Sequence, residues 1–234
     1  MKRFYKDVSI EPVTGGWQVM LDGRGIKTQQ GNLQIVPSEV LAEALAEEWR
    51  GQGEQIDPNS LKLRDHADYA IDVVAPDPAV AIASMLTYAE TDTLCYRADP
   101  DEPLFLRQLE LWEPLLARAE QRLGLKFERV SGIVHRHQRP ETLAALKSGL
   151  EARDPFTLAA LQALTSLSAS LVIGLEALED DAEAEALWQA ANCEEDWQAE
   201  QWGWERSAET RRAARFADFS RAIEFARLAR RTSQ

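Results

Sequence analysis

The sequence predicts an α+β protein, with a small N-terminal antiparallel β-sheet domain that carries one helix and a larger, mostly α-helical C-terminal domain. β-Branched and aromatic residues separated by glycine turns dominate the first 37 positions. After residue 61, apolar residues recur mainly at helical spacing. Since 234 residues suffice for one large or two small domains, we place the domains at 1–60 and 61–234.

The N-terminal strands are predicted by residue type and by their turns. "RFYKDVSI" and "GWQVMLDG" have strand composition, and Gly15 and Gly16 supply the turn between them. Asp22 and Gly23 are typical of a hairpin reversal, because glycine tolerates positive φ. "NLQIVP" predicts a further short strand that ends at Pro37.

The first helix is predicted to follow Ser38, a typical N-cap residue, and to end at Gly51. Leu41, Leu45 and Trp49 recur at helical spacing and define its apolar face. One helix on a small sheet buries the apolar faces of both elements. We therefore expect Trp49, and Trp17 in the second strand, to have structural roles.

Most of the remaining chain is predicted to be helical. "LFLRQLELWEPLLARAEQRLG" is a long amphipathic helix, while "DTLCYRA" and "LKFERVSGIVHRHQ" are candidates for extended segments. Four further helices are expected at about 140–151, at 155–178, either continuous or broken, at 181–202 and at 205–231.

Charge and the absence of targeting features narrow the function. The net charge is −13, and an acidic surface repels phosphate, so we expect no nucleic-acid partner. The acidity also discourages self-association, which favours a monomer. "MKRFYKDVSI" resembles no signal peptide, and the longest apolar run, "LTSLSASLVIGLEAL", is too short and too rich in serine to span a bilayer. We expect a cytoplasmic protein without membrane insertion.

Candidate catalytic residues are few. His135 and His137 would point the same way in an extended segment and could serve a metal, but Arg136 and Arg139 beside them disfavour a cation. Cys95 and Cys193 match no metal spacing and are expected to be buried. Neither Cys95 nor Ser170 lies in a sequence context typical of a nucleophile, and the glycine pairs do not form a phosphate loop. We predict no cofactor, no metal and no catalytic residue.

The segment "CEEDWQAEQWGW", residues 193–204, is the strongest candidate site. In a helix over 181–202, Glu194, Gln198 and Trp202 share one side with Leu187 and Ala191, while Asp196 points elsewhere. Glu194 would then face the interior or a partner. It could pair with an arginine of 211–231, or the cluster 194–196 could act with His135 or His137 in a carboxylate-based or metal-dependent hydrolase. Tryptophan rimmed by charge is typical instead of protein-binding surfaces.

Several stretches resemble, in order, the assembly chaperone family that serves the alpha subunit of the F-type ATP synthase head. They are "RFYKDVSI…GGWQVMLDGRGIKT…IVPSEVLAEALAEEW", "AETDTLCYRA…LWEPLLARAEQRLG" and "SASLVIGLEAL…CEEDWQAEQWG". The resemblance spans nearly the whole chain and implies a two-domain protein without catalytic activity. Such a protein would bind the unassembled alpha subunit, prevent its aggregation and release it when the beta subunit arrives. Members occur in mitochondria and bacteria, and the lack of a transit peptide indicates a bacterial cytoplasmic one.

The resemblance also implies functional residues. The family's acidic element maps onto Glu194, Glu195, Gln198, Trp202 and Gly203, which are the expected partner-binding residues. Its Glu-Trp pair maps onto Glu48 and Trp49. One departure is "KTQQGN", where a proline is expected after the lysine-threonine pair, and this affects only a turn.

Overall fold

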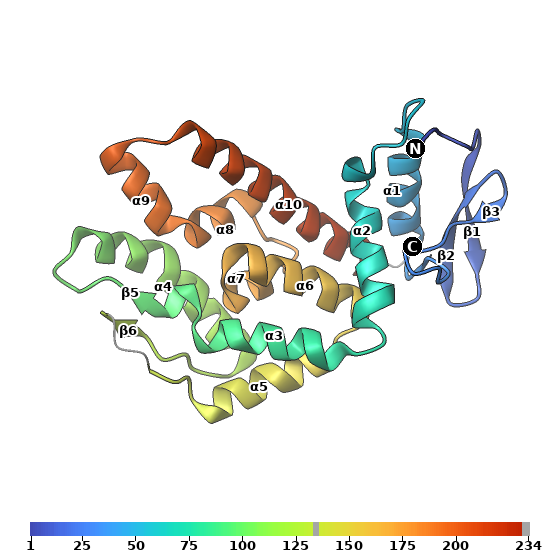
Figure 1. Cartoon of the computed structure of the whole chain (residues 1–234). Helices are drawn as coiled ribbons and strands as arrows, with labels where there is room; N and C mark the ends of the chain where they lie inside the picture. Colours follow the sequence, from blue (N-terminus) through green and yellow to red (C-terminus); the bar gives the residue numbers. More distant parts are fainter. Residues whose placement is uncertain (133–135, 231–234) are drawn as a thin grey trace. The chain divides into compact units, whose positions relative to one another are not determined.

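The chain folds into two compact units in the computed structural model, which describes residues 1–132 and 136–230 (Figure 1). Unit 1 combines Met1–Pro78 with Asp154–Ala160 and the end of the last helix from Glu224 onward, and unit 2 combines Ala79–Arg153 with Leu161–Ile223. The predicted α+β class is confirmed. The units differ from the predicted division at 60 and 61, because unit 1 takes in residues from three separate parts of the sequence.

The sheet of unit 1 is built around one central strand. β2 (Gly16–Leu21) pairs antiparallel with β1 (Val8–Val13), β3 (Arg24–Gly25) and β4 (Ile35–Val36). A Cβ atom on Gly16 would lie 2.2 Å from the carbonyl oxygen of Val36, so only glycine fits there. Asp22 and Gly23 have φ values of 49° and 73°, which confirms the predicted two-residue hairpin turn.

Helix α1 (Glu39–Arg50) packs against β1 and β2 (Figure 1). The backbone N–H of Leu41 donates to Oγ of Ser38 over 3.1 Å, so the predicted N-cap is present. Trp49 is buried, and its carbonyl oxygen accepts the hydroxyl of Tyr5 at 2.7 Å. Trp17 lies on β2, opposite Pro12 of β1 and Val36 of β4.

Glu48, on α1, caps the N-terminus of the next α-helix along the chain. α2 (Lys62–Tyr69) follows the short helix η1 (Pro58–Ser60) and continues into the π-helical turn η2 (Ala70–Val74). The N–H groups of Leu63 and Arg64 donate to the two carboxylate oxygens of Glu48 over 2.7 and 3.0 Å. A carboxylate that accepts from a helix N-terminus stabilises groups that lack partners within the helix.

The ends of two distant helices complete unit 1. The ring of Phe225 stacks on His66 of α2 at 5.2 Å and on Phe156 at 6.2 Å between centroids. The hydroxyl of Ser38 donates to the carbonyl of Leu228 over 2.6 Å. The core of the N-terminal unit therefore contains side chains from the last helix.

Unit 2 is mostly helical and is arranged around α4 (Pro103–Leu123), which contacts η3, α7, α8 and α9. Its elements are α3 (Pro78–Glu90), η3 (Thr93–Cys95), β5 (Tyr96–Arg97), α4, β6 (Val130–Ser131), α5 (Pro140–Glu151), α7 (Leu171–Glu176), α8 (Ala184–Ala191) and α9 (Cys193–Trp202). α6 (Pro155–Ser168) and α10 (Arg206–Arg230) contribute to both units. β5 and β6 pair in parallel, within the two segments that were predicted to be extended.

Two of the predicted helices are broken, the one over 155–178, for which a break was allowed, and the one over 181–202. The helix over 155–178 divides at Ala169, whose φ is 51°, and Ser170 caps α7 by accepting from the N–H of Ile173 at 3.0 Å. Ser170 was predicted to lie inside a helix over 155–178, but it is the N-cap of α7. The helix over 181–202 divides at Asn192 into α8 and α9.

Asp92 is a fully buried carboxylate that joins two helix N-termini. One oxygen accepts from the hydroxyl of Ser170 at 2.7 Å and from the N–H of Leu94 at 3.1 Å, and the other accepts from the N–H of Val172 at 3.0 Å. Burial raises its pKa to about 6, although these hydrogen bonds oppose the shift.

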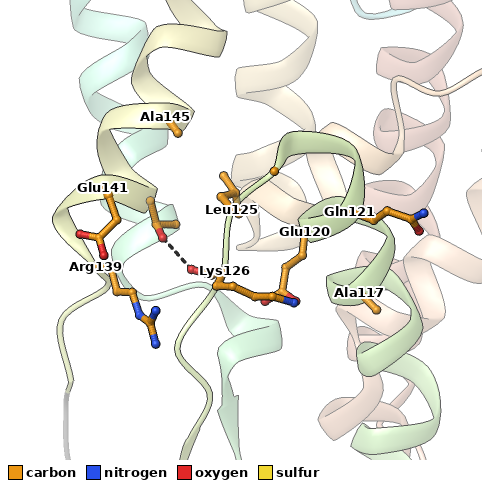
Figure 2. A pocket seen from close by; sticks show the side chains of 10 residues that line it. Ala117, Glu120, Gln121, Leu125, Lys126, Arg139, Glu141 and Ala145 are labelled. Atoms are coloured by element: carbon orange, nitrogen blue, oxygen red, sulfur yellow. Dashed lines mark hydrogen bonds and ion pairs between the residues drawn. The ribbon is translucent and has the colours of Figure 1, made fainter.

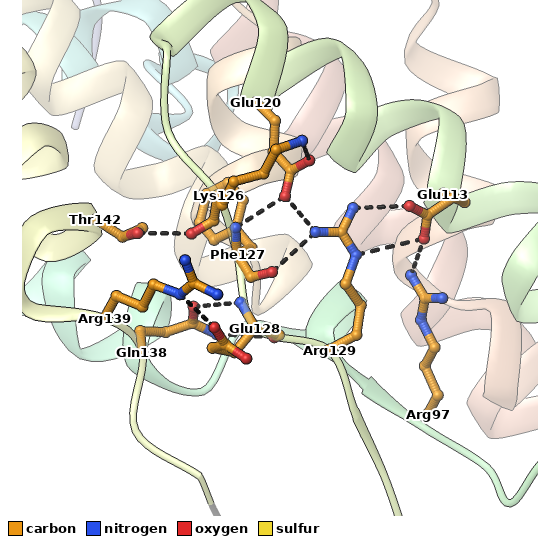
Figure 3. A network of polar contacts seen from close by, with 10 residues as sticks. All are labelled: Arg97, Glu113, Glu120, Lys126, Phe127, Glu128, Arg129, Gln138, Arg139 and Thr142. Atoms are coloured by element: carbon orange, nitrogen blue, oxygen red, sulfur yellow. Dashed lines mark hydrogen bonds and ion pairs between the residues drawn. The ribbon is translucent and has the colours of Figure 1, made fainter.

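Arg129 anchors the irregular segment after α4 (Figure 3). Its guanidinium pairs with Glu120, with the carbonyl of Phe127 at 2.9 Å and with Glu113 at 2.7 Å. Glu113 also pairs with Arg97 of β5 at 2.6 Å, so one network joins α4 to both short strands. Burial raises the pKa values of Glu113 and Glu120, but the hydrogen bonds from Arg129, together with those from Arg97 to Glu113 and from Lys126 and the N–H of Phe127 to Glu120, hold both pKa values below the ordinary one.

We predict that Asp92→Asn alters the pH dependence of stability. As the pH rises from 3.8 to about 6, the folded protein retains the proton on Asp92 while the unfolded chain releases it, so wild-type stability falls relative to the variant. The free energy of unfolding of wild type minus that of Asp92→Asn should decrease by about 3 kcal/mol across this window. Urea denaturation at several pH values measures it, and Asp77→Asn, at an exposed position, is the matched control. A difference that does not change with pH would contradict the assignment.

We predict that Arg129→Gln destabilises unit 2 at neutral pH by about 2 kcal/mol, because it leaves the buried Glu120 without its main partner. Arg139→Gln removes a more exposed pair with Glu128 and should cost less than about 1 kcal/mol. Because the folded-state pKa values of Glu113 and Glu120 are lowered, the Arg129 effect should be complete above pH 4.5 and shrink as the pH falls below it. Chemical denaturation above and below pH 4.5 tests this. Equal losses of unfolding free energy in Arg129→Gln and Arg139→Gln would contradict it.

Candidate partner-binding site

Helix α9 begins directly after a bend in the backbone at Asn192, where φ is −112° and ψ is 22°. Glu194, Glu195 and Asp196 occupy its first turn, where negative charge is favourable beside the positive end of the helix dipole. The helix ends at Gly203, whose φ of 84° suits glycine. These end signals define a ten-residue helix that is separate from α8.

The inner face of α9 is held by buried and paired side chains. Cys193 is buried, Asp196 pairs with Arg212 of α10 at 2.5 Å, and Glu200 pairs with Arg107 of α4 at 2.5 Å. The guanidinium of Arg107 also lies 5.9 Å from the ring centroid of Trp197. The sequence analysis considered an ion pair between Glu194 and an arginine of 211–231, but the acid that makes such a pair is Asp196.

Glu194 was predicted to face the interior or a partner, and it is exposed, unlike Leu187, which is buried. The predicted helix over 181–202 is interrupted at Asn192. The bend at Asn192 shifts the phase so that Cys193 takes the interior position. Asn192, followed after Cys193 by three acidic residues, is typical of a helix start, and this signal could have indicated the break.

The outer face of α9 brings together the five predicted partner-binding residues. Glu194, Glu195, Gln198, Trp202 and Gly203 are all exposed, and Trp202 is 80% exposed. Within the described residues, Glu195 makes no hydrogen bond or ion pair.

Glu194 differs from its neighbour because it contacts the protein interior. Its carboxylate accepts from Nε2 of Gln108 on α4 at 2.9 Å. Gln108 is fully buried, and its other amide atom accepts the N–H of Ala98 at 2.8 Å. Glu194 thus supports α9 and is also exposed on the outer face.

A groove of about 640 Å³ runs between α4 and α9. Leu106, which is 67% exposed, and Trp204, which is 41% exposed, line it together with charged residues, which are Arg107, Glu110, Asp196 and Glu200. Arg212 lies 5.5 Å from the ring centroid of Trp204. Leu106 was not predicted as a site residue, and Trp204 was included only as the end of the segment 193–204, because only the tertiary structure brings α4 and the end of α9 together.

Residues considered for catalysis have other roles in the structure. Burial raises the pKa of Cys193 to about 11 and that of Cys95 still further, which favours protonated thiols. Nδ1 of His137 lies 2.5 Å from Glu90, and His135 lies outside the described residues. In 1–132 and 136–230, no group of three His, Cys, Asp or Glu side chains could hold a metal ion. Glu194 and Asp196 face opposite sides of α9, so the geometry gives no support to a hydrolase that uses them together.

A second cavity, of about 660 Å³, lies where α4 ends and α5 begins (Figure 2). Three of its four charged lining groups are engaged within the protein: Glu120 pairs with Lys126 at 2.8 Å, and Arg139 pairs with Glu128, while Glu141 is exposed. The hydroxyl of Thr142 donates to the carbonyl of Lys126 over 2.6 Å. The cavity borders the Arg129 network through Glu120, and none of its described lining groups indicates a ligand.

Among the described residues, no single helix is long and apolar enough to cross a bilayer. The bent pair Lys62–Val74 and Pro78–Cys95 reaches that length and apolar composition only when its two parts are taken together.

Comparison with known proteins gives consistent matches. The model of the ATP12 chaperone protein family matches residues 2–120. Protein atp12 of mitochondria from Schizosaccharomyces pombe is 25% identical over 196 residues, which are 79% of this chain and 67% of that protein.

Solved structures extend the match to α9. Atp12 from Paracoccus denitrificans is 36% identical, with a TM-score of 0.93 and coverage of 98% of both chains. The Atu1473 protein from Agrobacterium tumefaciens is 38% identical, with a TM-score of 0.92 over 97% of this chain and 85% of that one. The chain therefore belongs to the ATP12 chaperone family and resembles bacterial members in sequence and fold.

Proposed function

We propose that this protein holds the unassembled alpha subunit of the F-type ATP synthase head, prevents its aggregation and promotes its assembly with the beta subunit. It acts as a monomer in the bacterial cytoplasm, without a cofactor and without catalysis. The observation that carries this proposal is the exposed outer face of α9, where Trp202 lies among acidic and amide side chains in a member of a chaperone family.

The chemistry of this face suits reversible binding to another protein. Large exposed apolar side chains are costly in water unless a partner covers them. Trp202 and Leu106 are among the most exposed of those described, and Trp204 is partly exposed beside them. Tryptophan is also enriched among residues that dominate binding energies at protein interfaces. Glu194 and Glu195 supply a polar rim, which favours a partner with basic residues around an apolar centre.

The direct test is capture of the client without nucleotide. Purified alpha subunit diluted from denaturant should remain in solution when this protein is present in equimolar amount, with no ATP added. Light scattering measures aggregation, and gel filtration detects the complex. Aggregation at the same rate with and without the protein would contradict the proposal.

We predict that Glu195→Ala and Trp202→Ala each weaken alpha-subunit capture several-fold or more while the free energy of unfolding changes by less than about 0.5 kcal/mol, because both side chains are exposed. Titration calorimetry or a pull-down series measures capture, and chemical denaturation measures stability. Glu141→Ala on α5 and Val80→Ala on α3, both at exposed positions, are the matched controls. Wild-type capture by both α9 variants would show that this face is not the client site.

We predict that Glu194→Ala lowers the free energy of unfolding by about 1 kcal/mol, because it leaves the buried amide of Gln108 without an acceptor. Glu194→Gln keeps an acceptor oxygen and should retain most of that stability. Capture by Glu194→Gln then separates two roles. Weak capture at normal stability assigns Glu194 to the client contact, whereas normal capture assigns it to the support of α9.

A further inference from the structure

Unit 1 contains a cavity of about 470 Å³ that has no part in the α9 surface. The N-terminal segment, the β2–β3 hairpin, α1 and α2 all contribute to its lining. Its apolar walls are formed by Phe4, Tyr5, Leu21, Ile26 and Trp49. Small-molecule and peptide pockets are typically of this size and are lined mainly by apolar residues, with a few polar groups that orient the ligand.

The aromatic wall is ordered by edge-to-face contacts. The ring of Tyr5 lies 5.4 Å from that of Phe4 and 5.7 Å from that of Trp49, with interplanar angles of 81° in both pairs. The hydroxyl of Tyr5 donates to the carbonyl of Trp49, which fixes both residues. Phe4, in contrast, is 64% exposed, so this wall presents an aromatic surface to whatever enters the cavity.

The charged lining of the cavity is mainly positive. Arg24, Lys27 and Arg64 line it, and Asp22 is the one acid among the lining residues. One carboxylate oxygen of Asp22 already accepts the N–H groups of Lys6 and Asp7, at 3.0 and 2.8 Å. Arg64 also pairs with Asp65 and Asp68, at 3.6 and 3.1 Å, so Arg24 and Lys27 supply the excess of positive charge over Asp22. In a chain with a net charge of −13, this local excess indicates an anionic ligand.

A buried donor lies beside the same cavity. Trp49 is 8% exposed, and Nε1 of its indole has no hydrogen-bond partner among the described residues. Nε of Arg64 is likewise buried without a partner, although its Nη2 pairs with Asp68 at 3.1 Å. Unpaired buried donors are costly, and an acceptor atom on a ligand is one partner that would remove this cost.

We propose that this cavity is a binding site for an apolar carboxylate, such as the C-terminal apolar residue of a peptide or a free apolar carboxylic acid. The apolar body lies against Phe4, Ile26 and Trp49, and the carboxylate lies toward Arg24, Lys27 and Arg64. Arginine binds carboxylates through charge-assisted hydrogen bonds, and the aromatic wall selects against small inorganic anions. The site is independent of the client surface on α9.

The test is an NMR titration of the ¹⁵N-labelled full chain with N-acetylphenylalanine, in which the indole resonance of Trp49 is the reporter. We expect this resonance to shift in a saturable manner, while N-acetylphenylalaninamide and acetate each bind at least about tenfold more weakly, because each lacks one half of the recognised group. No shift with any probe would overturn the proposal. An equal response to the amide would overturn the carboxylate assignment, and an equal response to acetate would overturn the apolar one.

Two variants test the lining without disturbing the core. Lys27→Gln and Phe4→Ala, both at exposed positions, should each weaken binding of N-acetylphenylalanine by about fivefold. Lys147→Gln on α5 makes the same change of charge elsewhere and should have no effect. Wild-type affinity in both lining variants would overturn the proposal. The tripeptide acetyl-Ala-Ala-Phe distinguishes the sources: tighter binding than the single residue assigns a peptide C-terminus, and equal binding assigns a free acid.

Discussion

The hydrogen bond from the indole of Trp112 to the carbonyl of Ala190, 2.8 Å long, is the contact on which the arrangement of unit 2 around α9 depends. Trp112 is fully buried on α4, and Ala190 lies just before the bend that separates α8 from α9. Gln108, one turn earlier on the same face of α4, bonds to Glu194 just after the bend. α4 therefore holds the chain on both sides of Asn192 and determines which residues of α9 face outward.

This arrangement divides the acids of α9 by function. The inner acids, Asp196 and Glu200, each have an arginine partner, so their charge is neutralised where the helix contacts its neighbours. The outer acids, Glu194 and Glu195, are exposed, so their negative charge faces solvent. Because a buried carboxylate without a partner is costly, this distribution lets one short segment both pack and present negative charge.

Turn and cap residues made the hairpin and α1 of unit 1 predictable from the sequence, whereas the position of α9 and its groove depends on contacts between distant residues. Asp22–Gly23, Ser38 and Gly51 are turn and cap residues whose preferences depend on their own backbone, so the hairpin and α1 follow from the sequence. The phase of α9 depends on Trp112, which lies 78 positions before its partner Ala190. Periodicity alone continued the predicted helix through Asn192. The groove residues Leu106 and Trp204 belong to separate elements, so no local pattern could group them.

The composition of unit 1 has a consequence for how the chain is made. Phe225 and Leu228 of α10 contact His66 and Ser38, so the N-terminal core includes residues near the other end of the chain. On the ribosome, the first domain to emerge cannot complete its core until α10 has been translated. Such contacts between distant parts of a sequence slow folding and leave apolar surface exposed in the interval. The protein that we propose protects another from aggregation is thus itself exposed to that hazard during its own synthesis.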